Sequence, residues 1–180
     1  MMTRTIRLDR VLRETVQTCY TDLVTRRTGE AVRSSIVRVL YEHGPGTAYL
    51  DFSEVGLVDW SCADEVVAKL LLGPPHEVCV VLQGLREEQI EAIEHVLEHH
   101  AIAALAEDPA GGPPRVLGRL APELVAAFRS LYGHGSLTAE ELARAIGWTA
   151  AQAEAALERL AALRLVRRHG PAYAAPTRPA

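Results

Sequence analysis

Several features that define other classes of protein are missing from this sequence. Its 180 residues contain only three cysteines, Cys19, Cys62 and Cys79, which lie far apart. An odd number without paired spacing favours reduced thiols over a disulfide framework. No apolar run approaches the ~18 residues that cross a bilayer, and the first ten residues lack the apolar stretch of a secretory signal. These absences predict a soluble, cytoplasmic protein that does not associate with membranes.

Motifs of common enzyme classes are also missing. There is no Gly-x-Ser-x-Gly elbow and no glycine loop between a strand and a helix that could hold a phosphate. His95 and His99 have the i, i+4 spacing of zinc ligands, but Val96 stands where catalytic zinc motifs carry a glutamate. With no third ligand evident, we expect a solvated histidine face. The sequence therefore predicts no enzymatic activity, no metal and no cofactor.

The charge that is present is unevenly distributed. The net charge of −4 combines 10 basic and 18 acidic residues in positions 1–114 with 9 basic and 5 acidic residues in positions 115–180. The composition changes at DPAGGPPRVLG, whose glycines and prolines cannot continue a helix or a central strand. We therefore expect an acidic domain and a basic domain that meet different partners. The expected boundaries are a domain at 1–107, a linker at 108–118, a second domain at 119–175 and a tail at 176–180.

The first domain alternates strand and helix patterns. Ser61, followed three residues later by Asp64, has the spacing of a capping box and predicts the start of a helix that ends before Gly73. Alternation at this spacing predicts a layered α/β domain with a sheet covered by helices. The predicted strands are 5–9, 19–25, 48–52, 77–83 and an edge strand at 101–107, and the predicted helices are 29–41, 61–72 and 87–99.

The second domain has a different pattern. Pro122 suits a first helical position, and Thr138–Glu141 and Thr149–Gln152 form two capping boxes on either side of Gly147. LVRRHGPAYAAP then predicts two short strands around a turn. A helix, a short helix, a glycine turn, a longer helix and a basic hairpin are typical of a winged helix-turn-helix.

The residues LDFSEVGLVDWSCADEVVAKLL, preceded by LVTRRTGEAVRSSI, resemble the STAS-like family, which includes bacterial anti-sigma-factor antagonists. The resemblance implies that residues 1–107 bind a regulatory protein, such as a kinase or an anti-sigma-type ATPase. It also implies a phospho-switch at a serine turn. Here that turn departs from the family's pattern, because Trp60 occupies the position that usually takes the phosphate and Ser61 is the neighbouring serine.

Asp59, Trp60, Ser61, Asp64 and Glu65 are the candidate partner-binding residues at this turn. Ser61 is a phosphoacceptor or a helix cap, and the cap is favoured because three nearby acids would repel a phosphoryl group. The three acids could hold a divalent cation, but solvated carboxylates at a helix start are the better interpretation. Trp60 is either buried in the core or exposed as an anchor for a partner.

In the second domain, DNA contact is predicted from the longer helix and the hairpin. Gln152 could read a base, although capping competes for its side chain, and glutamates on the same helix would repel phosphates. The arginines near the hairpin favour contact with the DNA backbone. Binding of protein alone is an equally open interpretation. The candidate residues are Gln152, Arg159, Arg164, Arg167, Arg168 and His169.

Together these patterns predict a bacterial regulatory protein of transcription or signalling. A STAS-like interaction or sensing module would be coupled to a winged helix that contacts double-stranded DNA, and the chain could form a homodimer. The alternative is a protein–protein adaptor in a signalling or defence assembly that binds no nucleic acid.

Overall fold

The computed structural model describes residues 3–17, 19–108 and 110–176. The chain divides into two compact units, Met1–Arg119 and Leu120–Ala180, which are described separately. In the part of the chain that the structure describes, no helix combines the length and apolar character needed to cross a membrane.

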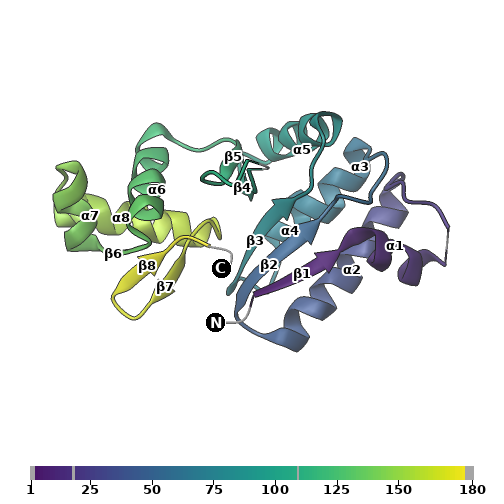
Figure 1. Ribbon diagram of the computed structural model, residues 1–180, viewed down its shortest axis with the longest axis horizontal. Coiled ribbons are helices and arrows are strands. Elements are labelled where there is room, and N and C mark those ends of the chain that lie inside the picture. The colour runs from purple at the N-terminus through teal and green to yellow at the C-terminus, as the bar shows by residue number, and fades with distance from the viewer. Residues whose placement is uncertain (1–2, 18, 109, 177–180) are drawn as a thin grey trace. The chain divides into compact units, whose positions relative to one another are not determined.

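The first unit is an α/β domain built on a mixed sheet (Figure 1). The strands follow one another across the sheet in sequence order, and neighbours from β1 to β4 pair in parallel. The last strand, β5, runs antiparallel to β4. The strands are β1 (Thr3–Arg7), β2 (Gly46–Asp51), β3 (Val78–Gln83), β4 (Ala103–Ala106) and β5 (Arg115–Gly118).

Helices connect the parallel strands. The stretch from Trp60 to Leu72 is continuously helical, but it changes from α-helical to π-helical turns and back. The helical segments are α1 (Leu8–Val16), α2 (Arg26–His43), α3 (Trp60–Ala63), the π-helical η1 (Asp64–Lys69), α4 (Leu70–Leu72) and α5 (Glu87–His99).

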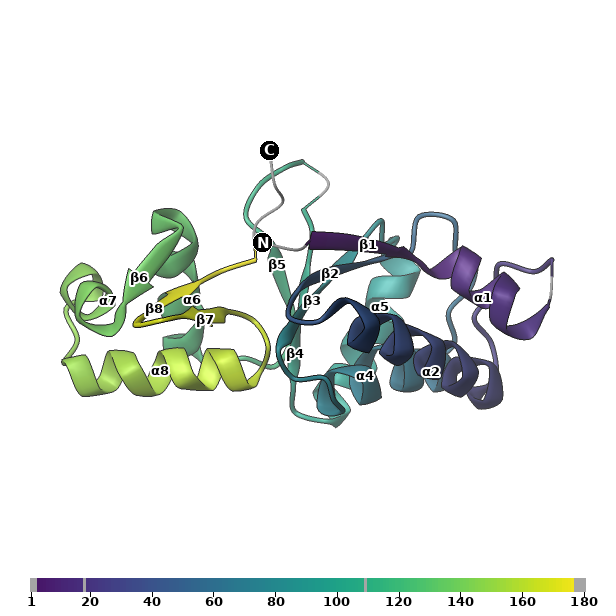
Figure 2. The same cartoon turned by 90° about the horizontal axis from the view of Figure 1, so that it is seen from below.

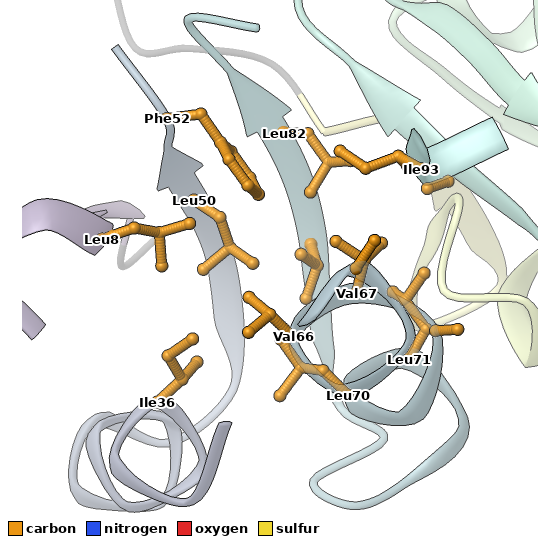
Figure 3. Packing of buried hydrophobic residues seen from close by; sticks show 14 of the residues in the cluster. Leu8, Ile36, Leu50, Phe52, Val66, Val67, Leu70, Leu71, Leu82 and Ile93 are labelled. Carbon is orange, nitrogen blue, oxygen red and sulfur yellow. The ribbon is translucent and has the colours of Figure 1, made fainter. Parts of the chain in front are cut away.

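The core lies between one face of the sheet and these helices. Leu50 and Phe52 from the β2 segment and Leu82 from β3 point toward side chains of α2, η1, α4 and α5 (Figure 3). Those helical partners include Ile36, Val66, Leu70 and Ile93. β2 and β3 are buried along nearly their whole length, as the continuous apolar runs of the sequence predict.

Gly29 allows α2 to lie close to the helix that begins at Trp60. A Cβ atom at this position would lie 2.9 Å from Glu65 Cβ and 3.0 Å from Cys62 Cα. These distances are shorter than van der Waals contact, so only glycine fits without movement of one helix.

The described residues of the second unit form three helices and a small antiparallel sheet. α6 and α7 both contact α8, which directly follows α7 (Figure 2). Thr138 and Thr149 cap α7 and α8 in the two predicted capping boxes, and Gly147 ends α7 with a positive φ of 73°. The elements are α6 (Pro122–His134), β6 (Ser136–Thr138), α7 (Ala139–Ile146), α8 (Ala150–Ala162), β7 (Arg167–His169) and β8 (Ala172–Ala174), with strand order β6-β8-β7.

Two expectations for the first unit are corrected. Residues 19–25 were expected to form a strand, but the described residues there make only an isolated bridge, between Leu23 and Val58. The stretch 108–118 was expected to be a linker, yet Arg115–Gly118 form β5, so β4 is an internal strand and the first unit extends to Arg119. Of the expected tail at 176–180, residues 177–180 lie outside the described residues.

Candidate functional site

The turn that precedes Trp60 is held from two sides. On one side, backbone bonds connect it to the segment before α2: Leu23 N–H donates to Leu57 O at 2.7 Å, and Asp59 N–H donates to Leu23 O at 3.0 Å. On the other side, the buried Gln89 of α5 donates to the carbonyls of Val55 at 3.0 Å and Gly56 at 2.9 Å. Because both sides fix the backbone, the loop presents its side chains in a defined position.

Asp59, and not Ser61, caps the helix. The Asp59 carboxylate accepts from the backbone N–H of Cys62 at 2.7 Å and from that of Thr25 at 3.0 Å. The Ser61 hydroxyl also donates to Asp59, at 2.8 Å. Burial opposes ionisation of Asp59, but these donors outweigh it and lower the pKa of the carboxyl. The expected Ser61 cap is therefore corrected, because a better-placed acceptor lies two residues earlier.

Asp64 and Glu65 take part in an internal ion-pair network. The Arg26 guanidinium contacts Asp64 at 2.8 Å and Glu65 at 2.9 Å, and Arg33 contacts Glu65 at 3.1 Å. Lys69 also pairs with both acids. The Glu65 side chain is only 3% exposed. Its charge is neutralised inside the unit, so the expectation that Glu65 faces solvent or a partner is corrected.

Asp64 also contacts the residue that directly follows α5. His100 Nε2 lies 2.6 Å from its carboxylate. Burial would raise the pKa of Asp64, but hydrogen bonds from Arg26 and His100 and the charge of Lys69 lower it to about 2. The network holds α2, the π-helical segment and the end of α5 together. Asp64 therefore has a structural role within the unit.

Trp60 is an exposed side chain, so the interpretation that buries it in the core is wrong. It is 60% exposed, and its ring stacks on the His95 ring of α5 with centroids 4.3 Å apart and planes 19° from parallel. Leu57, in the turn before it, is 59% exposed. Large apolar side chains with this exposure on a rigid support are typical of protein-binding sites.

Two hollows flank the stacked rings. One, of about 500 Å³, is bordered by Leu57, Trp60 and Ser61 together with glutamates of α5. The other, of about 420 Å³, lies along α5 and includes His95 and Arg115. Glu91 borders both hollows. We call the following set the docking surface: Leu57, Trp60, Ser61, Glu88, Glu91 and His95.

Sequence reasoning identified Trp60 and Ser61 but missed the contribution of α5. The sequence predicts only a helix at 87–99, although a signal for an acidic surface is present: between Glu87 and His99 the helix contains five glutamates and no lysine or arginine. That His95 stacks on Trp60 depends on a contact between segments 35 residues apart, which spacing alone does not reveal.

The three histidines in and directly after α5 make different contacts. His95 stacks on Trp60, His100 pairs with Asp64, and His99 packs edge-on against His100. Within the described ranges, no group of three or more His, Cys, Asp or Glu side chains is arranged to hold a metal ion.

In the second unit the predicted DNA-binding residues differ in their accessibility. Arg159, Arg168 and His169 are exposed. Gln152 is exposed too, but its side-chain oxygen accepts from Thr149 N–H at 3.0 Å in the capping box, as the sequence indicated. Arg164 is 3% exposed and is therefore buried, so its expected place in a solvent-facing cluster is corrected.

The hairpin orients its remaining charges. Arg167 is half-buried and donates to His169 Nε2 at 2.7 Å. The Arg168 guanidinium lies 5.7 Å from the centre of the Tyr173 ring and donates to Gly170 O at 3.1 Å. These contacts place two exposed cationic or titratable side chains, Arg168 and His169, beside the turn.

Comparison with known proteins adds no family assignment. No protein-family model matches this sequence, and no curated protein matches it significantly.

Proposed function

We propose that this protein is a regulator without enzymatic activity. Its first unit, a STAS-like module, binds a protein partner at the docking surface, and its second unit, a winged helix-turn-helix, contacts the DNA backbone through its hairpin. The observation that carries the proposal is Trp60: an indole 60% exposed, stacked on α5 at 4.3 Å and fixed at a helix start. A large aromatic held rigid and exposed loses little conformational entropy when a partner covers it.

The order of elements supports the winged-helix part of the proposal. Two capped helices, α7 and α8, are joined by a turn at Gly147, and a hairpin of β7 and β8 follows. Arg168 and His169 near the hairpin turn are suited to phosphate contact. The exposed Glu158 on α8 disfavours base reading by that helix, so we assign the hairpin the main contact.

The proposed docking function is tested by using the intact protein to capture partners from a native lysate. Mass spectrometry then identifies the captured proteins. We expect Trp60→Ala to lose a partner that the unaltered protein retains. Tyr41→Ala is the matched control, because Tyr41 is 59% exposed on α2 and lies outside the docking surface. Equal recovery of every partner with Trp60→Ala would refute the proposed site. The same spectra report any phosphate on Ser61.

The DNA part is tested by binding to a generic duplex over a series of salt concentrations. A hairpin that contacts phosphates gives affinity that falls with salt, with a slope of about −0.9 for each phosphate neutralised. Arg168→Ala should weaken binding and reduce that slope by about one, whereas Arg129→Ala, an exposed arginine on α6, should leave both unchanged.

A second candidate function is supported by the charges of α8. Glu158 is exposed and Glu154 is half-buried beside the Tyr173 hydroxyl, which donates to it at 3.3 Å. Acidic side chains on this helix suit a protein partner better than DNA. In that case the protein is an adaptor with two protein-binding units, and it will show no salt-dependent retention of duplex DNA.

A further inference from the structure

We infer that the docking surface accepts a cationic segment, rich in arginine or lysine, that also carries a large apolar side chain. This inference rests on the proposed docking function and specifies the chemistry of the partner. Three observations support it: the negative charge of α5, the apolar side chains beside Trp60, and the ion-pair network that compensates Asp64 and Glu65 in the same unit.

The glutamates of α5 are spaced so that they repel one another. Glu87 and Glu91, and Glu94 and Glu98, are i, i+4 pairs, and Glu88 and Glu91 are an i, i+3 pair. Like charges at these spacings destabilise a helix by about 0.2–0.5 kcal/mol per pair. Among the described residues, the only ion pair that any of them makes is that between Glu94 and Arg115, at 3.3 Å with both side chains exposed.

Two acids in the same unit, Asp64 and Glu65, are compensated by nearby cations. Asp64 and Glu65 are surrounded by Arg26, Arg33 and Lys69 within the same unit. Charge compensation is therefore available to this fold, but among the described residues Glu88 and Glu91, which border the hollow of about 500 Å³, make no ion pair. A cationic partner would supply the missing compensation at the surface.

The apolar part of the surface lies next to this charge. Leu57, Val58 and Ala92 border the hollow of about 500 Å³ together with Trp60. Val58 and Ala92 are already buried, so an apolar side chain of the partner would cover the exposed Leu57 and Trp60. An arginine of the partner could stack on the indole, since aromatic faces attract guanidinium ions. The flanking glutamates would repel nucleic acids and anionic lipid surfaces, which leaves a cationic polypeptide as the occupant.

The test uses the full chain and three fluorescein-labelled helical peptides. The first carries arginines on one side and leucines on the other. The second has glutamate at each arginine position, and the third has serine at each leucine position. Fluorescence anisotropy measures the dissociation constant. We expect the arginine–leucine peptide to bind most tightly, the serine version to bind at least about tenfold more weakly, and the glutamate version not to bind.

Charge reversal locates the site. The double substitution Glu88→Lys, Glu91→Lys should raise the dissociation constant of the arginine–leucine peptide by about tenfold or more. Glu14→Lys with Glu30→Lys makes the same change in net charge at exposed positions of α1 and α2 and should leave binding nearly unchanged. The comparison of peptides on the unaltered chain needs no variant, so it stands even where a substitution impairs folding.

The outcomes separate this inference from the proposed function. Equal or tighter binding of the glutamate peptide, or no loss in the Glu88→Lys, Glu91→Lys variant, overturns the inference. Should Trp60→Ala still lose its captured partner in that case, the docking function stands and only the partner's charge was wrongly inferred. When Trp60→Ala affects neither the peptide nor any captured partner, the docking function itself fails.

Discussion

The helix that carries Trp60 depends at its start on the carboxylate of Asp59 rather than on the hydroxyl of Ser61. Asp59→Ala removes the acceptor of two backbone N–H groups, at 2.7 and 3.0 Å, and should lower the free energy of unfolding by about 1–2 kcal/mol. Ser61→Ala removes only a donor to Asp59 and should cost less than about 0.5 kcal/mol. Urea unfolding of the two variants measures the difference, and a larger loss for Ser61→Ala would contradict the assignment of the cap.

At Gly29 the packing of two helices leaves no room for a methyl group. Gly29→Ala would bring a Cβ within 3.0 Å of Cys62 Cα and should destabilise the first unit by about 1–3 kcal/mol. Gly133→Ala is the control, because no atom lies within 4 Å of the added Cβ in α6 and alanine favours the helix. In thermal unfolding, Gly29→Ala should lower the melting temperature and Gly133→Ala should raise it. A neutral Gly29→Ala would mean that the helices move apart at little cost.

The sequence predicts a helix start at this turn, as observed, but it predicts the wrong capping residue, and the reason is local. Asp59 and Ser61 are both good capping residues, and Ser61 has Asp64 at capping-box spacing. What favours Asp59 is the backbone N–H of Thr25, 34 residues away, which binds its second oxygen. Local spacing carries no information about that contact, and the same holds for the burial of Glu65 by Arg26 and Arg33.

At the scale of the helices, the ion-pair network around Asp64 should make the free energy of unfolding of the first unit fall at acidic pH. Asp64 has a pKa of about 2 in the folded protein, below the ordinary value of 3.8 for an aspartate carboxyl. Its contribution is therefore present above pH 3.8 and is lost as the pH falls toward 2, a change of about 2 kcal/mol.

Asp64→Asn isolates this effect from the other acids whose pKa values are also lowered. Because asparagine does not titrate, the stability difference between the unaltered protein and the variant should shrink by about 2 kcal/mol between pH 5 and pH 2. Urea unfolding at several pH values provides the measurement. If the free energies of unfolding of the two proteins change in parallel over the whole pH range, ionisation of Asp64 in this network adds nothing to stability.

Elements with strong local signals were predicted well. The helix expected at 87–99 is α5 with the same limits, and both capping boxes of the second unit are present. The elements that were missed are short or depend on distant pairing. β5 has only four residues after a glycine- and proline-rich stretch, and it exists because it pairs with β4. α1 follows β1 without a turn residue between them, so no break in the sequence separates the two.

For the whole molecule, the limit of the first unit is the feature most open to direct measurement. A fragment of residues 1–119 retains β5, whereas a fragment of residues 1–107 loses it, exposes one edge of β4 and removes the fully buried Leu117. Burial of one leucine contributes about 1.5–3 kcal/mol. The longer fragment should therefore unfold cooperatively and at the higher temperature in a circular dichroism melt. Identical melts would mean that β5 adds nothing to the stability of the first unit.

The environments of the three cysteines have a practical consequence. Cys62 is buried, burial together with the charge of Asp59 raises the pKa of its thiol to about 12, and its sulfur donates to Thr25 O. Cys79 is buried as well, and Cys19 is exposed. Since alkylating reagents need an accessible thiolate, a maleimide dye added to the native protein should attach to Cys19 and leave the other two unlabelled. The natural sequence thus offers one position for a spectroscopic probe, without any engineered substitution.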